Sequence, residues 1–334
     1  MKTITRVLLI VLIVSVLSQC KKDTLPSTIP DKNFLNALIE RGVDKNGDGI
    51  ISTGEAAEVT FLDVSYCIIS DLKGIEVFIN LDSLYCNFNK LTSLDFSNNT
   101  TLTGLNCSQN KLTSLDFSKN TTLTGLNCSW NELTSLDVSK NTALTYLECS
   151  ANRLTSLDVS NNTALTYLEC GSNQLTSLDV SNNAVLTYLN CAGYQLTSLD
   201  VSKNTALTYL DCAVNKLTSL DVSNNTALTE LYCYTNQLTS LDVSKNTALT
   251  RLLCDGNKLT SLDVSNNTDI AYLSCDNTQL TSLNLSNNTS LEELNLMSMP
   301  SLYKVCVWTM PFPPAGVTVD TINSPNVYFT MECN

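Results

Sequence analysis

Leucines recur along the chain with a fixed 21-residue period between Leu81 and Ser290. Each repeat reads, with small changes, LTYLECSxNxLTSLDVSxNTA, and ten copies follow one another without a break. One leucine keeps the same phase in every copy: Leu91, Leu112, Leu133, Leu154, Leu175, Leu196, Leu217, Leu238, Leu259 and Leu280. Self-similarity at a fixed period of this size predicts a solenoid, in which each repeat forms one coil stacked on the next.

Each repeat contains two half-units with the same order of apolar positions. The first reads LxxLxCxxN, as in Leu144, Leu147, Cys149 and Asn152. The second reads LxxLDVSxN, as in Leu154, Leu157, Val159 and Asn162. The second leucine and the Cys or Val are two residues apart, so they point to the same side of a β-strand. Because Ser, Thr, Asn and Asp favour turns over helix interiors, the pattern predicts two short parallel strands per coil, with a turn after each.

This pattern resembles the leucine-rich repeat, whose signature is LxxLxLxxNxL, in a nested form that carries the motif twice in each repeat. The resemblance covers about two thirds of the chain, and cysteine stands where the third apolar residue is usually leucine. It implies a mainly β leucine-rich-repeat solenoid over residues 59–290, made of one 22-residue coil and ten 21-residue coils. It also implies interaction or adhesion as the class of function.

Ten of the 14 cysteines occupy one inward position of the repeat. They are Cys86, Cys107, Cys128, Cys149, Cys170, Cys191, Cys212, Cys233, Cys254 and Cys275. Stacked coils place equivalent side chains about 4.8 Å apart, whereas a disulfide needs Cβ atoms about 3.8 Å apart. We therefore predict reduced, buried thiols that act as small apolar side chains. A metal-thiolate array is the alternative, although the paired CxxC spacing typical of such sites is missing.

Polar residues also form columns. Two columns of asparagine are predicted to satisfy backbone groups in the turns, as Asn152 and Asn162 exemplify. A column of nine aspartates is predicted to face solvent: Asp95, Asp116, Asp137, Asp158, Asp179, Asp200, Asp221, Asp242 and Asp263. Cation binding along this column is an alternative to a plainly solvated face.

One outward strand position carries tyrosine in four consecutive coils, namely Tyr146, Tyr167, Tyr188 and Tyr209. Two residues further on lie Glu148, Glu169, Asn190 and Asp211. Rigid aromatic area with hydroxyls and neighbouring acids is typical of a recognition surface, so these residues are candidate partner-binding residues. The alternative is that stacked tyrosines stabilise the coil by packing against one another.

Residues 1–20 have the order of a targeting segment: Lys2 and Arg6, then an apolar run, then Leu-Ser-Gln-Cys. The run is too short to favour a membrane-spanning helix. The last four residues resemble the lipobox of bacterial lipoproteins, which implies lipidation at Cys20. Lys21-Lys22-Asp23 looks like the export tag of some Bacteroidetes lipoproteins, so we expect a lipid anchor in the outer membrane and surface exposure. An ordinary signal peptide with an incidental Cys20 is the alternative.

A polar tether at residues 21–30 leads to an expected N-terminal cap at 31–58, beginning with a helix. The helix is followed by DKNGDGIISTGE, which resembles an EF-hand or dockerin-type calcium loop. The resemblance implies six ligands of a structural calcium ion: Asp44, Asn46, Asp48, the Ile50 carbonyl, Ser52 and Glu55. The alternative is an Asp/Gly-rich turn before a helix.

Residues 291–334 break the repeat and are expected to form a last coil and an irregular C-terminal cap. Cys306 and Cys333 are the two cysteines of this tail, so we expect a disulfide between them in an exported protein. Free, buried thiols are the alternative.

Composition narrows the functional class further. A net charge of −13 with no histidine makes nucleic acid an unfavourable partner, and Ser-His or Cys-His catalytic pairs are impossible. The acid pairs repeat identically, whereas a glycosidase needs two carboxyls in different environments. We therefore expect a monomeric, non-enzymatic surface lipoprotein that binds protein through its tyrosine face. Carbohydrate binding, or a structural spacer without a ligand, are the alternatives.

Overall fold

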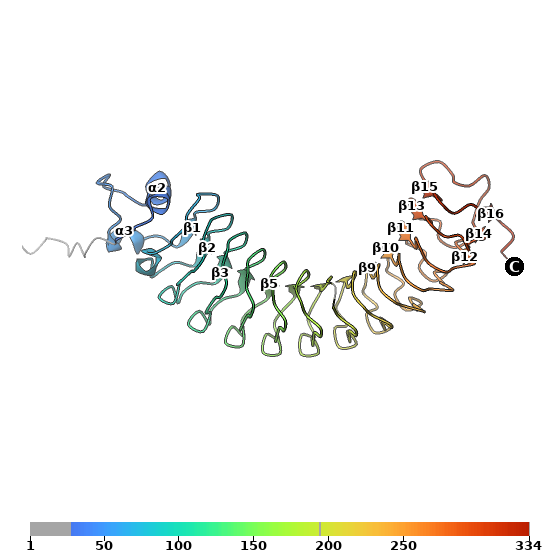
Figure 1. Cartoon of the computed structure of the whole chain (residues 1–334), viewed down its shortest axis with the longest axis horizontal. Coiled ribbons are helices and arrows are strands. Elements are labelled where there is room, and N and C mark those ends of the chain that lie inside the picture. Colours follow the sequence, from blue (N-terminus) through green and yellow to red (C-terminus); the bar gives the residue numbers. More distant parts are fainter. Residues whose placement is uncertain (1–27, 194, 334) are drawn as a thin grey trace, which may run out of the picture.

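The computed structural model describes residues 28–193 and 195–333. These residues form a curved rod of stacked coils, with the main β-sheet on its concave side and mostly turns and loops on its convex side (Figure 1). The predicted fold class is confirmed: a mainly β parallel solenoid with few helices. Within the described part of the chain, no helix has the length and apolar content needed to cross a membrane.

The N-terminal cap consists of two helices, α2 (Lys32–Glu40) and α3 (Thr53–Ala56), with a loop between them. Asp31 caps α2, because its carboxylate accepts hydrogen bonds from the backbone N–H groups of Asn33 and Phe34. The same carboxylate accepts from Ser70 and Asp71 in the first coil, so one side chain both starts the helix and fixes it to the solenoid.

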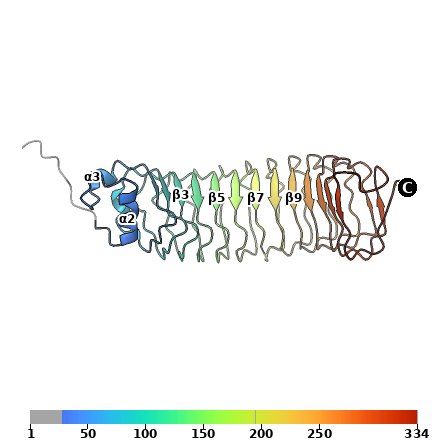
Figure 2. The same ribbon diagram turned by 90° about the horizontal axis from the view of Figure 1, so that it is seen from above.

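The main sheet runs along the concave side and is parallel throughout (Figure 2). Across the described residues its thirteen strands are β1 (Phe61–Asp63), β2 (Ser83–Tyr85), β3 (Gly104–Asn106), β4 (Gly125–Asn127), β5 (Tyr146–Glu148), β6 (Tyr167–Glu169), β7 (Tyr188–Asn190), β8 (Tyr209–Asp211), β9 (Glu230–Tyr232), β10 (Arg251–Leu253), β11 (Tyr272–Ser274), β13 (Glu293–Asn295) and β15 (Thr318–Asp320). The register steps by one repeat, so equivalent side chains of successive coils lie side by side.

The prediction of two strands in every coil is wrong for most of the solenoid. A second sheet contains only β12 (Ser282–Asn284), β14 (Lys304–Cys306) and β16 (Tyr328–Thr330) among the described residues. A short 3₁₀ helix (η2, Ile75–Val77) lies on an early coil. The curvature explains the difference: a backbone ladder needs strands about 4.8 Å apart, and the convex segments diverge from one another (Figure 1).

The interior is a continuous column of leucine, cysteine and valine. In a typical coil, Leu144, Leu147, Cys149, Leu154 and Val159 are all fully buried. The ten repeat cysteines are free and buried, as predicted, and behave as small apolar side chains. Burial raises the pKa of these thiols, to about 12 at Cys107 and Cys170.

The C-terminal cap is more regular than expected, because β15 and β16 extend both sheets beyond the last regular repeat. Phe312, which stands between two prolines in the loop after β14, packs its ring against those of Trp308 and Phe329. Cys306 and Cys333 are joined by a disulfide, with their Cα atoms 5.3 Å apart.

Candidate interaction surface

The four predicted tyrosines form one row on the concave sheet. Tyr146, Tyr167, Tyr188 and Tyr209 each begin a strand, and the buried leucine that follows each of them anchors the strand in the core. The rings stack nearly parallel, with centroids 4.5, 4.2 and 4.2 Å apart along the row. The spacing between coils therefore matches the stacking distance of aromatic rings, and the sequence places one ring in each coil.

The predicted acidic residues lie beside this row, on the third position of the same strands. The Tyr167 hydroxyl donates to Glu169 Oε2 at 2.9 Å, and the Tyr146 hydroxyl donates to Glu148. Each of these hydroxyls is thereby oriented by a carboxylate of its own strand. The structure brings together the tyrosines and acids that the sequence analysis named as a surface.

Burial and like charge both act on the acids of this face. Burial, together with the neighbouring carboxylate of Glu169, raises the pKa of Glu148. Burial also raises the pKa of Asp211, against the effect of the Ala213 N–H that it accepts. A partner that brings positive charge to this face would therefore stabilise the charged form of these carboxylates.

The row continues further than the sequence analysis recognised. In the next coil, Glu230 occupies the first strand position, where the four preceding coils have tyrosine, and Tyr232 occupies the third. The Tyr232 ring nevertheless continues the row, since its centroid lies 5.3 Å from that of Tyr209. Beyond it, the Arg251 guanidinium lies 5.5 Å from the centroid of the Tyr272 ring. The sequence could have indicated this continuation, because the strand reads Tyr-Leu-Glu at residues 146–148 and Glu-Leu-Tyr at residues 230–232.

The predicted calcium loop folds back on itself through its own side chains. Gly47 and Gly49 have φ values of 75° and 77°, which favour glycine. The Asp44 carboxylate accepts from both of their N–H groups, at 2.8 and 2.9 Å. Asn46 and Asp48 accept from the N–H groups two residues further on, so the loop turns around its oxygen atoms.

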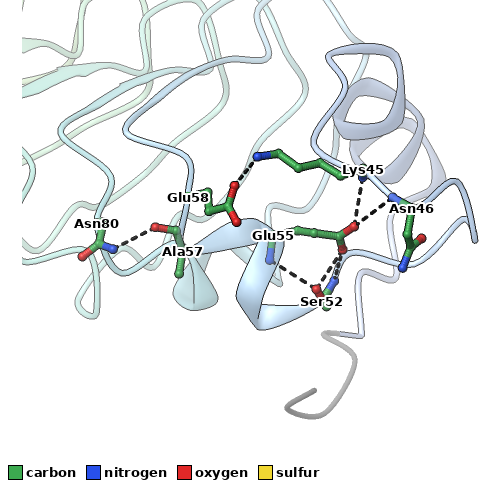
Figure 3. A network of polar contacts seen from close by, with 7 residues as sticks. All are labelled: Lys45, Asn46, Ser52, Glu55, Ala57, Glu58 and Asn80. Carbon is green, nitrogen blue, oxygen red and sulfur yellow. Dashed lines mark hydrogen bonds and ion pairs between the residues drawn. The ribbon is translucent and has the colours of Figure 1, made fainter. Parts of the chain in front are cut away.

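Glu55 lies on the inner side of this loop (Figure 3). Its carboxylate accepts from the N–H groups of Lys45 and Ser52, both at 2.9 Å, and it forms a capping box with Ser52 at the start of α3. The Ser52 N–H bond is the largest cause of its lowered pKa. The donor set is all oxygen and suits calcium, but no three carboxylates or thiols converge as metal ligands within the described ranges.

No family profile matches the chain. A 71-residue segment, 21% of the chain, is 44% identical to Internalin J of Listeria monocytogenes and spans only 8% of that protein's length. The chain is also similar to the functional domain of InlJ from Listeria monocytogenes, which includes a cysteine ladder: 34% identity over 85% of this chain and 78% of that one, TM-score 0.49.

Two further structures resemble the fold. One is an internalin (inlF) from Listeria monocytogenes, at 23% identity over 94% of this chain and all of that chain, with a TM-score of 0.72. The other is the leucine-rich repeat domain of APL1B, at 20% identity over 91% of this chain and 94% of that domain, with a TM-score of 0.60. The chain is a leucine-rich repeat protein. Such solenoids typically offer an extended concave surface for binding other proteins.

The aspartate column of this leucine-rich repeat protein has a local structural role. Asp158 accepts the Ser160 N–H at 2.9 Å, and the equivalent bond recurs along the convex side. Bonds from the Ser160 hydroxyl and N–H lower the pKa of Asp158. Each carboxylate therefore closes its own turn, which accounts for the repetition of aspartate, and cation binding stays the untested alternative.

The lipidation site of the leucine-rich repeat protein, Cys20, lies outside the described residues, as do the signal segment and most of the tether. Lipid anchoring and surface exposure therefore stay predictions.

Proposed function

We propose that this chain is a cell-surface lipoprotein whose leucine-rich-repeat rod binds a protein ligand through the tyrosine and acid residues of its concave face. One observation carries the proposal: the repeats differ at the outward strand positions and in the turn that follows each strand, and they agree almost everywhere else. Tyr146, Tyr188 and Arg251 hold one such position, whereas the buried leucines and asparagines scarcely change. Solenoid proteins typically bind their partners through a concave surface whose exposed side chains vary between repeats while the buried residues stay constant.

The stacking of the rings favours a protein ligand over a carbohydrate. A sugar ring packs against the open face of an aromatic side chain, but Tyr167 and Tyr188 have both faces covered by neighbouring rings. What the row presents is ring edges, hydroxyls and carboxylates, which suit hydrogen bonding and charge pairing with a polypeptide.

Replacing Tyr146, Tyr167, Tyr188 and Tyr209 together by serine tests the proposal. Capture of envelope and host proteins by the purified chain is compared with binding to a glycan array. We expect the variant to lose its protein ligands, while Tyr303→Ser and Tyr328→Ser, which change exposed tyrosines at the C-terminal end, keep them. Unchanged capture by the fourfold variant, or glycan binding alone, would contradict the proposal. A fall in melting temperature without loss of ligand would support the spacer interpretation.

We propose lipidation at Cys20 as the anchor of the rod. Metabolic labelling with radioactive palmitate should mark the wild-type chain and leave Cys20→Ser unlabelled and released from the membrane. Label on the variant would contradict this.

We further propose that calcium stiffens the N-terminal cap. The loop oxygens of Asp44, Asn46 and Asp48 lie on one turn, and Glu55 is held beside them. When bound, the ion would add a rigid cross-link between the loop and α3. We expect millimolar calcium to raise the melting temperature of the cap in the wild type and not in Asp44→Asn/Glu55→Gln. Identical melting curves with calcium and with chelator would contradict this role.

A further inference from the structure

The tyrosine row has an open end at Tyr146. In the two preceding coils, the equivalent strand positions are Gly104 and Gly125. A Cβ atom built on Gly125 meets no other atom within 4 Å, so the space above this strand is open. One face of the Tyr146 ring is covered by Tyr167, and the opposite face borders this space. Tyr146 is 36% exposed, and the other three tyrosines of the row are only partly exposed.

The Glu148 carboxylate leans toward the same space. It accepts a hydrogen bond from the side-chain amide of Asn127, which belongs to the same strand as Gly125, and another from the Tyr146 hydroxyl. Both donors are neutral. The ion pairs Lys45–Glu58 and Arg153–Glu132 do not involve Glu148, and within the described residues no cationic side chain pairs with its carboxylate.

At the other end of the aromatic row, an arginine side chain of this chain covers the face of a tyrosine ring. Arg251 occupies the tyrosine position of its own coil and places its guanidinium over the Tyr272 ring. It also pairs with Tyr232 on the preceding strand, and this interaction is the main cause of its raised pKa. On this sheet, therefore, a guanidinium takes the place of a ring in the row and lies between tyrosines and acids.

We propose that the space over Gly125 receives an arginine side chain of the protein partner, stacked on the open face of Tyr146 and hydrogen-bonded to Glu148. The proposal rests on the proposed function and names the chemistry of its partner. A planar guanidinium fits the slot of the absent ring and can donate two hydrogen bonds to a carboxylate, whereas the ammonium of lysine can do only the second. The net charge of −13 favours a basic partner segment.

Fluorescence anisotropy with three labelled peptides tests the assignment. The peptides share a Gly/Ser sequence and differ only in carrying arginine, lysine or citrulline, the uncharged analogue of arginine. We expect the arginine peptide to bind the wild-type chain about tenfold more tightly than the citrulline peptide. Gly125→Thr, which fills the space with a side chain suited to a strand, and Glu148→Gln should each remove this preference. Glu293→Gln, the same charge change further along the face, should keep it.

Equal binding of the arginine and citrulline peptides, or a preference that survives Gly125→Thr, would overturn the assignment. Lysine binding as tight as arginine would overturn it too, since charge alone would then explain the binding. Melting temperatures of both variants show whether they are folded. If Gly125→Thr and Glu148→Gln capture protein ligands as well as the wild type does, while the fourfold tyrosine variant does not, the arginine site is refuted and the proposed function stands.

Discussion

The two halves of one coil have nearly the same sequence but form their hydrogen bonds to the neighbouring coils in different ways. The strand half, residues 144–152, joins its neighbours through a backbone ladder on the concave side. The convex half, residues 154–162, has only an isolated bridge, between Asp158 and Asp137, and the amide of Asn162 donates to the carbonyls of Val138 and Asn141 in the preceding coil. Where curvature separates the backbones, a side chain carries the hydrogen bonds between coils.

The asparagines that end the two halves differ in the same way. Asn152 uses its whole amide: its Nδ2 donates to Cys128 O and Cys149 O, and its Oδ1 accepts from Leu133 N. Asn162 uses only its Nδ2, and its buried Oδ1 has no hydrogen-bond partner. The inward residue differs too, since the strand half has a titratable cysteine and the convex half has valine. Sensitivity to pH and to amide loss should therefore concentrate in the strand half.

The largest effect that we expect is alkaline unfolding. The pKa of each buried thiol is raised above its ordinary value near 9.0, and reaches about 12 at Cys107 and Cys170. The folded state therefore keeps the proton longer than the unfolded state, and stability falls as pH rises above 9 toward 12. Each thiol contributes a loss approaching about 1.4 kcal/mol per pH unit, so ten of them cost on the order of 10 kcal/mol between pH 9 and 10.

Urea unfolding at a series of pH values measures this slope. Changing Cys149 and Cys170 to valine, the residue of the convex half, should reduce the slope by about two tenths, because two of ten thiols are removed. The tyrosines add a smaller loss that begins near pH 9, because their ordinary pKa is 10.0 and is raised by burial at Tyr167 and Tyr209. The difference between the slopes of the wild type and the double valine variant cancels this contribution. A flat profile between pH 8 and 10 would show that the thiols do not control stability.

Next in size is the loss of an asparagine from the strand half. Asn152→Ala leaves the Leu133 N–H buried without an acceptor and removes a donor from the Cys128 and Cys149 carbonyls, which each keep one other asparagine donor. We expect a loss of about 3 kcal/mol in the free energy of unfolding, most of it from the unpaired N–H. Asn152→Asp is a useful companion, since it keeps the acceptor and loses the donors. A cost below that of Asn162→Ala, the equivalent change in the convex half, would contradict the comparison.

Much of this architecture could be predicted because the repeat fixes it locally. A constant period and an alternation of inward and outward positions give the stacking, the cysteine column and the tyrosine row, since every coil must repeat the geometry of its neighbour. The same logic placed Glu148 and Glu169 beside the tyrosines. These features depend on residues that are close in sequence or one full period apart.

The features that could not be predicted depend on how the coils are inclined to one another. The sequence LDVS carries the pattern of a strand, but curvature decides whether it pairs, and curvature is a property of the whole stack. The part played by Arg251 was hidden for a related reason, because its neighbours Tyr232 and Tyr272 lie in other coils and on two different strand positions. The loop at residues 44–55 is a third case. Its residue spacing predicts which oxygen atoms could bind calcium, but the hydrogen bonds that these oxygens accept within the loop could not be predicted from the sequence.

The smallest effect that we expect is the loss of an asparagine from the convex half. Val138 O and Asn141 O also accept hydrogen bonds from the backbone N–H groups of Asn141 and Leu144, so Asn162→Ala leaves neither carbonyl without a partner. The change also removes an oxygen that is buried and unpaired in the wild type, which offsets part of the loss. We expect a cost of about 1 kcal/mol by urea unfolding, roughly a third of that for Asn152→Ala. Equal costs for the two variants would show that the convex amides are as essential as the concave ones, and that the coils depend on both halves alike.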